Sequence, residues 1–336
     1  MTAPRREYLL PVDLRLHGRG DAAPLAGGPL AFGAVERIVR EGDAVRRERL
    51  PWRGVTGGPA FAALTAPRPA PFDRPRLMGI LNVTPDSFSD RGRFAEVDAA
   101  VAQGLRMVEE GADIADVGGE STRPGAREVP VEEELRRVLP VVERLAAAGV
   151  AVSVDTRKAR VMREAVAAGA TVINDVSGLT HDPGALAAAA ATGARVILMH
   201  MRGEPATMNA APSYTYAALE VFDELEARVL AAEAAGIPRE LIVVDPGLCF
   251  AKHEPHNLDV LRHLAMYHAL GCPLLVGVSR KGWTAAIHER WRPAERQPST
   301  LAAGFWAFQQ GARCLRVHDV GAHRQTLVAF EALAGV

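Results

Sequence analysis

The sequence predicts a parallel (β/α)8 barrel, an α/β fold, preceded by a short N-terminal extension. From Arg76 onward, an alanine-rich helical stretch, a glycine, a short β-branched run and a group of polar residues recur seven times. An eighth apolar run, Leu77–Val83, precedes these repeats. Eight such units over about 260 residues match the usual size of this barrel. An open doubly wound sheet is the alternative, but no GxGxxG follows the first strand to hold a dinucleotide.

The composition excludes several classes of protein. With 48% hydrophobic and 24% charged residues among 336, the chain is neither disordered nor short of core material. The 39 basic and 40 acidic residues nearly cancel, which argues against a nucleic-acid partner or a polybasic membrane surface. Neither an 18-residue apolar run nor a signal peptide is present, and the three cysteines lack zinc spacing. The sequence therefore predicts a cytoplasmic protein with small-molecule partners.

Residues 1–75 differ from the rest of the chain. They are rich in glycine and proline, and residues 30–39 alternate weakly between apolar and polar side chains. Four prolines between residues 67 and 75 indicate a stiff, extended linker. We expect a small appendage of short strands and turns over 1–75 and the barrel over 76–336. The sequence does not indicate what the appendage does.

Within the barrel, the repeated glycine suits the residue that follows a helix, because glycine adopts positive φ without a steric penalty. These glycines are Gly111, Gly149, Gly169, Gly193, Gly236, Gly271 and Gly311. The apolar runs after them span four to six residues without strict alternation, as in strands buried on both faces. Between the runs the spacing is helical, and the apolar residues between Val131 and Leu145 fall on one stripe.

Polar side chains follow nearly every predicted strand. They are Asn82, Asp116, Asp155, Asn174, His200, Asp245, Ser279 to Lys281 and Arg316 to His318. The carboxyl ends of the strands of a barrel meet at one face, so these side chains are expected to converge there. One acidic residue after a strand is commonly a helix cap, as Asp155 or Asp175 could be, and His200 or Asp116 could be structural. Polar residues at all eight ends favour a functional site.

The types of residue at these ends indicate what the site binds. Carboxylates accept the paired N–H donors of a guanidine-like heterocycle, and charge-assisted bonds of this kind are strong. Lys281, Arg316 and His318, with Arg123 on a loop, suit a phosphate. Lysine is rare in this chain, which makes Lys281 a poor candidate for a surface residue. Neither a nucleophile–base pair nor a zinc-type spacing is evident. The predicted site holds a heterocycle at one end and an anion at the other.

The motifs at the strand ends closely resemble those of dihydropteroate synthase, in the same order and over residues 76–336. They are MGILNVTPDSFSD (78–90), GADIADVGGESTRPGA (111–126), SVDTRKA (153–159), INDVSG (173–178), MHMRGEPATM (199–208), DPGLCFAK (245–252), GVSRK (277–281) and RVHD (316–319). The resemblance implies a transferase of folate synthesis. Such an enzyme joins 6-hydroxymethyl-7,8-dihydropterin diphosphate to 4-aminobenzoate and releases 7,8-dihydropteroate and pyrophosphate. It also implies a homodimer that uses Mg²⁺.

The resemblance assigns roles residue by residue. Residues that match the pterin diphosphate site are Thr122, Asp155, Asn174, Asp245, Lys281, Arg316, Val317 and His318. Asn82 matches the Mg²⁺ ligand, and amide oxygen is chemically suitable. Residues that match the 4-aminobenzoate pocket and two closing loops are Asp86, Phe88, Asp90, Arg123, Pro124, Phe250, Ser279 and Gly282. Four of these residues are expected to act in catalysis: Asp155, Lys281, Arg316 and His318.

The implied reaction suits this set of residues. An arylamine is a weak nucleophile, so catalysis is expected to come from Mg²⁺-assisted loss of pyrophosphate, which leaves a pterin methylene cation. The arylamine then attacks that cation. Its proton is acidic enough to pass to water, which explains why the sequence shows no nucleophile–base pair.

Three residues depart from the usual pattern. Arg91 replaces a glycine of the first loop, Cys249 replaces a frequent glycine, and Gly282 replaces a serine whose hydroxyl could hold the aminobenzoate carboxylate. Arg91 and Gly282 keep open a catalytically silent pterin-binding paralogue. A corrinoid-linked pterin methyltransferase is a second alternative, although it would not need the SRK and RVHD motifs that the chain contains.

Overall fold

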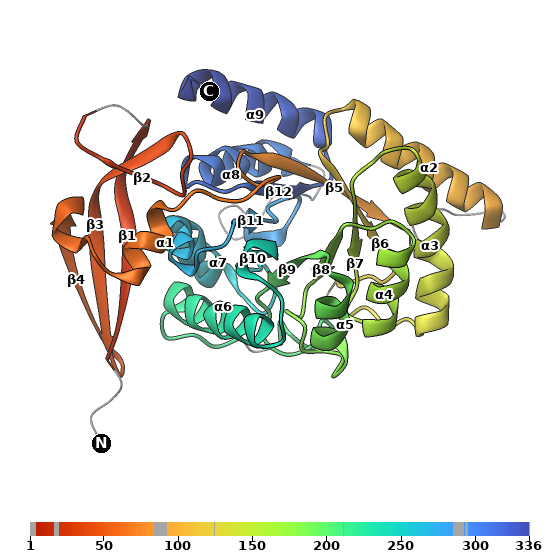
Figure 1. Ribbon diagram of the computed structural model, residues 1–336, viewed down its shortest axis with the longest axis horizontal. Helices are drawn as coiled ribbons and strands as arrows, with labels where there is room; N and C mark the ends of the chain where they lie inside the picture. Colours follow the sequence, from red (N-terminus) through yellow and green to blue (C-terminus); the bar gives the residue numbers. More distant parts are fainter. Residues whose placement is uncertain are drawn as a thin grey trace.

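The computed structural model describes residues 5–16, 20–83, 93–123, 125–210, 212–284, 292 and 295–335. Figure 1 shows two parts, an antiparallel sheet near the N-terminus and a barrel formed by the remaining elements. The sheet comprises β1 (Arg5–Leu16), β2 (Ala23–Pro24), β3 (Leu30–Glu41) and β4 (Ala44–Pro51). A 3-10 turn, η1 (Trp52–Val55), and helix α1 (Pro59–Thr65) follow it.

The extension is more regular than the sequence indicates. β3 pairs with β1 along one edge and with β4 and β2 along the other, all antiparallel. β1 and β3 each contain 12 residues, so the expectation of short strands was wrong for these two. Their length follows from a shared buried face, on which Tyr8 lies opposite Ile38 and both are at most 2% exposed.

The barrel contains eight parallel strands, as predicted. They are β5 (Arg76–Asn82), β6 (Ile114–Gly118), β7 (Val152–Asp155), β8 (Val172–Asp175), β9 (Arg195–Met199), β10 (Ile242–Asp245), β11 (Leu275–Val276) and β12 (Cys314–Val317). From β5 to β10 each strand neighbours the next one in the sequence, and β12 pairs with both β11 and β5. A parallel bridge between Val244 and Leu274 links β10 to the β11 side. The barrel is therefore nearly closed.

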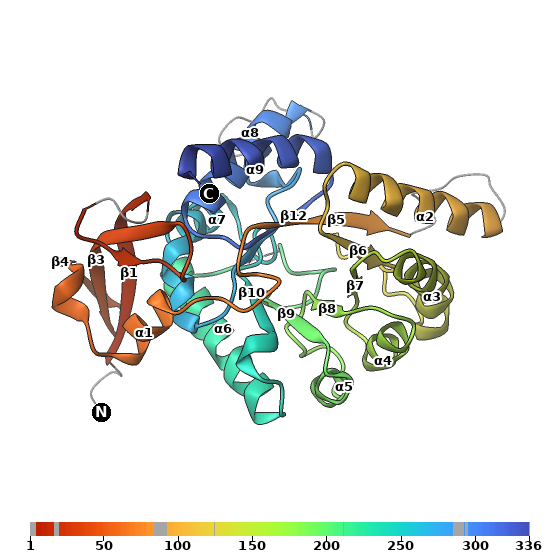
Figure 2. The ribbon, with the colours of Figure 1, turned by 45° about the horizontal axis from the view of Figure 1, so that its top comes forward.

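A helix follows each strand and lies on the outside of the barrel (Figure 2). The helices are α2 (Arg93–Glu109), α3 (Val131–Ala147), α4 (Ala159–Ala167), α5 (Ala185–Thr192), α6 (Ala217–Ala234), α7 (Glu254–Arg262), α8 (Gln297–Gln309) and α9 (Val320–Ala334). Shorter 3-10 segments are η3 (Arg239–Leu241), η4 (Leu264–Leu270) and η5 (Gly282–Thr284). All seven glycines predicted to follow helices have positive φ, between 65° and 113°. This backbone conformation lets each helix end and the chain turn into the next strand.

The linker closes the bottom of the barrel. Phe72 is fully buried against one apolar side chain from each of seven strands. Those side chains are Met78, Ile114, Val172, Ile197, Val243, Leu275 and Cys314. Arg195 lies over the Phe72 ring at 5.5 Å and donates a hydrogen bond to the Ala70 carbonyl (2.8 Å). The proline-rich segment thus contributes to the barrel core.

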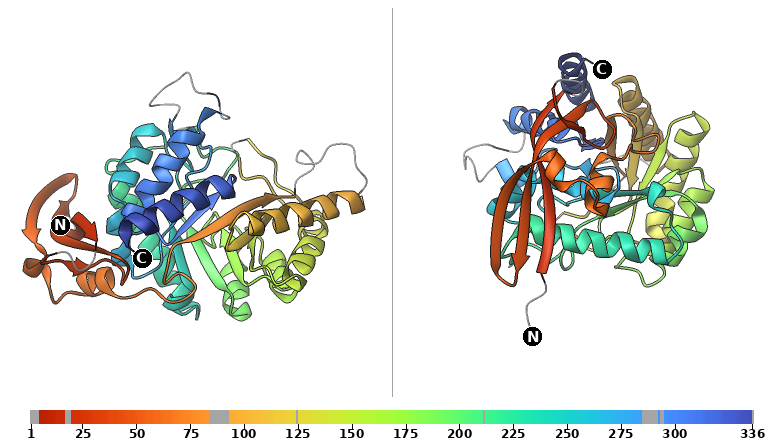
Figure 3. Two further views of the ribbon diagram at one scale, coloured as in Figure 1. Left: turned by 90° about the horizontal axis from the view of Figure 1, so that it is seen from above. Right: turned by 60° about the vertical axis from the view of Figure 1, so that its left-hand side comes forward.

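The extension docks on the side of the barrel near α6 and η4 (Figure 3). Asp223 of α6 accepts hydrogen bonds from Tyr8 (3.0 Å) and Arg40 (2.5 Å) and pairs with Arg6 (2.7 Å). The Tyr8 ring packs edge-on against Phe222, with centroids 5.6 Å apart. The sheet is therefore fixed to the barrel by a partly buried charged cluster and an aromatic pair.

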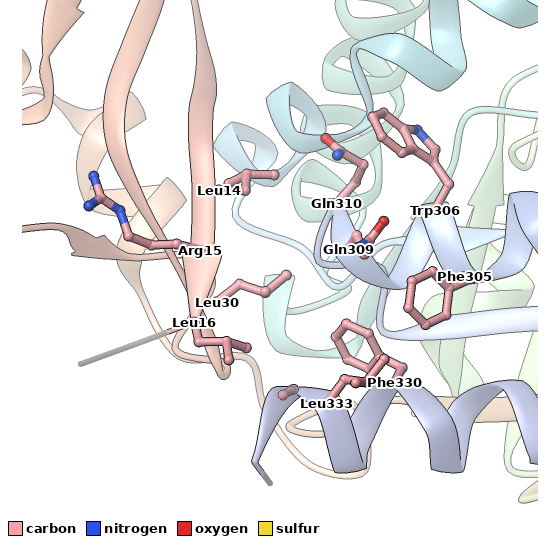
Figure 4. A pocket seen from close by; sticks show the side chains of 11 residues that line it. Leu14, Arg15, Leu16, Leu30, Phe305, Trp306, Gln309, Gln310, Phe330 and Leu333 are labelled. Atoms are coloured by element: carbon pink, nitrogen blue, oxygen red, sulfur yellow. The ribbon is translucent and has the colours of Figure 1, made fainter. Parts of the chain in front are cut away.

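A hollow of about 350 Å³ remains between the extension and helices α8 and α9 (Figure 4). Its sheet side is apolar, with Leu14, Leu16 and Leu30 facing the helices. Phe305 and Phe330 form much of the opposite wall. This hollow lies beside the barrel, apart from the ends of its strands.

Candidate active site

The carboxyl ends of the strands bring the predicted polar side chains together, as expected for parallel strands in a barrel. Asp155 ends β7 and pairs in register with Gly118 of β6 and Asn174 of β8. Asp116 lies two residues before the end of β6. We call the end of the barrel at which the carboxyl ends of the strands meet the mouth. The Asp116 side chain lies in the barrel interior just beneath this mouth and is fully buried.

One arginine joins the acidic residues of this mouth. Arg316 Nε lies 2.6 Å from Asp116 Oδ2, and Arg316 Nη2 lies 2.6 Å from Asp155 Oδ2. Asn174 donates its amide Nδ2 to the same Asp116 oxygen at 3.1 Å. The other oxygen, Asp116 Oδ1, is buried and has no hydrogen-bond partner among the described residues. A buried acceptor of this kind is costly unless a donor reaches it, so the mouth is prepared for a ligand with N–H groups.

Burial and neighbouring charges shift the acid–base behaviour of these groups. Burial raises the pKa of Asp155 to about 7, while Arg316 lowers it and Asp116 raises it further. Burial also raises the pKa of Asp245, against the opposing effect of Lys281. Burial lowers the pKa of Arg316, but Asp116 and Asp155 outweigh it and leave that pKa above its usual value. Arg316 therefore stays charged while Asp155 titrates near neutral pH.

Lys281 and Phe250 follow neighbouring strands of the barrel and meet. Lys281 Nζ donates to the Leu248 carbonyl (2.9 Å) and lies 4.8 Å from the centre of the Phe250 ring. The absence of a side chain at Gly277 provides room for this lysine, because a Cβ there would lie 3.1 Å from Lys281 Nζ. The same Cβ would lie 3.9 Å from Asp245 Oδ2. Lys281 thus lies near the Asp245 carboxylate and makes a cation–π contact with the Phe250 ring.

His318 differs from the cation that the sequence suggested. Ser279 Oγ accepts the backbone N–H of His318 (3.1 Å) and lies 3.0 Å from its Nδ1. Burial, together with the nearby Arg280 and Arg316, lowers the pKa of His318 to about 4. Burial and these arginines favour the neutral ring, and where the Ser279 hydroxyl donates to Nδ1 the ring proton lies on Nε2. His318 therefore offers an N–H donor rather than a positive charge.

The remaining predicted site residues differ in how far they are exposed. Thr122 is half-buried and Arg123 exposed on the segment between β6 and α3, and Gly282 is exposed at the start of η5. Val317 is buried at the end of β12. The predicted loop residues Asp86, Phe88, Asp90 and Pro124, and the departure at Arg91, lie outside the described residues.

Two side chains near the mouth have structural partners. Asp175 accepts hydrogen bonds from Ser177 and from the Leu179 backbone N–H, so it caps a turn. His200 is buried with partners on both ring nitrogens, Lys252 at 2.7 Å and Glu224 at 3.0 Å. The structural interpretation of His200 therefore agrees with its surroundings.

Sequence reasoning missed a buried ionic network beside Asp155. Glu120 binds Lys158 (2.6 Å) and Arg157 (2.5 Å) and accepts the Val129 backbone N–H (2.8 Å). Lys158 also pairs with Glu134 at 2.5 Å. These contacts hold the segment that carries Thr122 and Arg123. The scarcity of lysine, with Lys158 three residues after Asp155, was the available signal.

The surroundings of Asn82 fit a Mg²⁺ ion completed by other ligands. Asn82 Oδ1 and Asp155 Oδ2 lie 3.8 Å and 3.6 Å from the place that a Cβ on Gly118 would take. That glycine leaves space between two oxygen atoms, the ligand type that Mg²⁺ prefers. In the described part of the chain, no group of three His, Cys, Asp or Glu side chains could hold a metal ion by itself. Water and substrate phosphate would therefore supply the remaining ligands.

Comparisons with known proteins show that the chain belongs to a known family. Residues 78–318 match the family model described as pterin-binding enzyme. The chain is 49% identical over 247 residues to dihydropteroate synthase of Escherichia coli strain K12, covering 73% of this chain and 87% of that protein. It is also 49% identical over 248 residues to a probable bifunctional folylpolyglutamate synthase/dihydropteroate synthase of Haloferax volcanii. That match covers 74% of this chain but only 29% of the longer relative.

A solved structure gives the same result. Dihydropteroate synthase of Xanthomonas albilineans with 4-aminobenzoic acid superposes with a TM-score of 0.74 at 51% sequence identity. The match covers 79% of this chain and 95% of that one. Among the described residues, no helix is long and apolar enough to cross a membrane.

Proposed function

Because the chain belongs to the dihydropteroate synthases within the pterin-binding enzyme family, we propose that it joins 6-hydroxymethyl-7,8-dihydropterin diphosphate to 4-aminobenzoate. The products are 7,8-dihydropteroate and pyrophosphate. The observation that carries this proposal is the cluster of Asp116, Asp155, Asn174 and Arg316, which leaves a buried carboxylate oxygen without a partner. A pterin ring presents an amino group and ring N–H donors that such acceptors bind.

The proposed pterin site comprises Asp155, Asn174, Asp245 and Lys281. Buried carboxylates at Asp155 and Asp245 would accept the N–H donors of the ring, and Asn174 would pair with a donor and an acceptor on its edge. Thr122, Arg316, Val317 and His318 would hold the diphosphate. In the ligand-free arrangement Arg316 binds two carboxylates, so its guanidinium would turn toward or share its donors with the phosphate.

In the proposed reaction, the bond between the pterin methylene carbon and the diphosphate oxygen breaks, and pyrophosphate leaves with the electron pair. Arg316 and the Nε2–H of His318 would bind the growing negative charge of the leaving group. The carboxylates of Asp155 and Asp245 would favour the positive charge that spreads into the dihydropterin ring. Mg²⁺ bound at Asn82 would neutralise further charge on the diphosphate. The arylamine nitrogen then forms the C–N bond and loses a proton to water.

The arylamine is proposed to bind beside Lys281, between the Phe250 ring and the segment from Ser279 to Gly282. Arg123 would close over it from the β6–α3 segment. Asp86, Phe88, Asp90 and Pro124 are proposed loop contacts as well, although they lie outside the described residues. The structure of the Xanthomonas albilineans relative with 4-aminobenzoic acid supports this choice of arylamine.

Pyrophosphate release from the pterin diphosphate, measured with Mg²⁺ in the presence and absence of 4-aminobenzoate, tests this function. We expect release that depends on the arylamine and is matched by formation of dihydropteroate. Pterin binding without turnover would instead indicate a silent paralogue. Methyl transfer from a methylated folate to a corrinoid protein, without pyrophosphate release, would indicate the methyltransferase.

The cell compartment, assembly and division of the chain are also proposed. Three free cysteines, Cys249, Cys272 and Cys314, suit the reducing cytoplasm. Family membership supports a homodimer. We also propose that residues 1–75 and 76–336 are separate segments, with catalysis confined to the second.

A further inference from the structure

Lys252 is a buried lysine in the loop that connects β10 to α7, and the proposed reaction does not use it. Only 3% of the residue is exposed. The same loop carries Phe250, and Lys281 binds the backbone of this loop as well. Burial of a lysine is expensive unless its N–H groups are satisfied, so the contacts of Lys252 indicate what the group does.

Lys252 Nζ binds the backbone of its own loop, and burial lowers the pKa of this amine to about 7. Nζ donates to the carbonyl oxygens of Gly247 (2.9 Å) and Phe250 (3.1 Å). Lys281 Nζ donates to the Leu248 carbonyl between them (2.9 Å). Three of four successive carbonyls, 247, 248 and 250, are therefore held by two lysines. The Phe250 ring packs against one of these lysines while its carbonyl binds the other.

The third partner of Lys252 orients it. His200 Nδ1 lies 2.7 Å from Nζ, and His200 Nε2 lies 3.0 Å from Glu224 Oε2. Burial lowers the pKa of His200 to about 4, so the ring is neutral, accepts at Nδ1 and donates from Nε2 to Glu224. Glu224 on α6 and His200 after β9 thus direct Lys252 Nζ at the loop.

The loop needs such a restraint because of its backbone conformation. Gly247, Cys249 and Ala251 all have positive φ, of 67°, 66° and 50°. Cysteine and alanine rarely adopt this region, because their Cβ approaches the backbone carbonyl oxygen. Surrounding structure must hold such residues in place. Asn257 assists by accepting the Cys249 backbone N–H at 2.7 Å.

We propose that Lys252 is a positioning residue that fixes the 247–251 loop and thereby sets the affinity for the carboxylated arylamine. This inference rests on the proposed function, since it concerns the arylamine pocket at Phe250. Lys252 acts through the loop and not on substrate. Its loss is expected to displace the Phe250 ring most and to leave Asp155 in place. Asp245 accepts the Gly247 backbone N–H of this loop at 2.8 Å, so its carboxylate is expected to shift less than the ring does.

The test compares Lys252→Met with the wild-type chain by steady-state kinetics. We expect the KM for 4-aminobenzoate to rise by about 10- to 100-fold, as for a small misplacement of a binding group. The KM for the pterin diphosphate is expected to rise by a clearly smaller factor, because the same loop reaches the pterin site only through Asp245 and Lys281. Arg262→Met is the matched control, because it removes an exposed positive charge from the adjoining helix α7. It is expected to change neither constant.

Ala251→Gly provides a rescue, because glycine adopts positive φ freely. Added to Lys252→Met, it is expected to restore part of the lost affinity, whereas alone it leaves both KM values unchanged. If the Met variant does not fold, Lys252→Gln replaces it, since a shorter amide keeps donors but cannot reach both carbonyls. Hydrogen exchange of amides 247–251 should accelerate in either variant.

The outcomes separate this inference from the proposed function. A wild-type protein without arylamine-dependent pyrophosphate release would contradict the function itself. An active wild type whose folded Lys252 variant keeps its KM for 4-aminobenzoate would overturn the role of Lys252 alone. Equal increases of both KM values would also overturn it, because they would show a general loss of structure.

Discussion

At the scale of single residues, the Asp155 carboxyl group makes ligand binding depend on pH. Its pKa of about 7, raised mainly by burial, means that the group is partly protonated at neutral pH. A pterin that offers N–H donors binds the carboxylate form of Asp155. At lower pH the Asp155 carboxyl group must therefore lose its proton before the pterin binds. We expect affinity for 6-hydroxymethyl-7,8-dihydropterin to fall by up to about tenfold per pH unit below 7 and to level off above it.

Calorimetric titration between about pH 5.5 and 8 measures this dependence. The pterin alcohol is the suitable ligand, because it has no diphosphate to titrate in this range. Asp155→Asn is expected to bind weakly at every pH, since its amide replaces an acceptor with donors. Equal wild-type affinity across the range would show that Asp155 does not accept the pterin N–H groups as a carboxylate.

Gly282 allows a second prediction at this scale. A Cβ at this position would meet no atom of the described residues within 4 Å, so serine fits without displacing any of them. The introduced hydroxyl could donate to the aminobenzoate carboxylate, although solvent would weaken the bond at this exposed position. We expect Gly282→Ser to lower the KM for 4-aminobenzoate by about two- to tenfold. Steady-state kinetics decide this, and a changed KM for the pterin diphosphate alone would contradict it.

At the scale of elements, the linker before β5 stabilises the barrel through Phe72. Its ring belongs to a buried cluster with side chains from seven strands, at the end opposite the candidate active site. Phe72→Ala would leave a cavity that these rigid strands cannot fill. We expect the free energy of unfolding to fall by about 3–5 kcal/mol.

Urea denaturation measures the effect of this substitution. Leu333→Ala is the control, because Leu333 is 71% exposed and its truncation should change stability by less than about 0.5 kcal/mol. Similar losses in the two variants would show that Phe72 does not complete the barrel core.

At the scale of the whole molecule, Asp223 connects the extension to the barrel. It binds Tyr8, Arg6 and Arg40, and its removal would leave two arginines without this partner. The side chains of Asp223, Arg6 and Arg40 remain 19% to 34% exposed, so solvent screens part of their charge interaction. We expect Asp223→Ala to lower the free energy of unfolding by about 1–3 kcal/mol and to leave kcat unchanged. A large loss of activity without a loss of stability would instead connect the extension to catalysis.

Predictability from sequence differs between the two parts of the molecule. In the barrel, each unit repeats the same sequence pattern, which consists of a helical apolar stripe, a glycine with positive φ and a buried apolar run. This pattern therefore predicts all eight strands. In the extension, the alternation over residues 30–39 is weak, and the 12-residue strands depend on pairing with a distant partner. Their length could not be obtained from local spacing alone.

The candidate site shows the same division. Motifs identified Asp155, Asn174, Asp245 and Lys281 because each lies at or just after the end of a strand, and strand ends in a barrel meet. Sequence reasoning did not anticipate that Arg316 binds Asp116 and Asp155, since 200 and 161 residues separate these pairs. It also grouped His318 with the cations and did not anticipate that burial and two arginines lower the pKa of its ring.

The sequence by itself determined the barrel, the family and the chemistry available at the mouth, because backbone preference, hydrophobic period and short motifs are properties of neighbouring residues. Tertiary structure alone decided how that chemistry is arranged. Closure of the barrel places Phe72 beneath seven strands and Arg316 between two carboxylates. It also directs Lys252 at the backbone of its own loop. These contacts depend on burial and on distances between residues far apart in the chain, which no local pattern encodes.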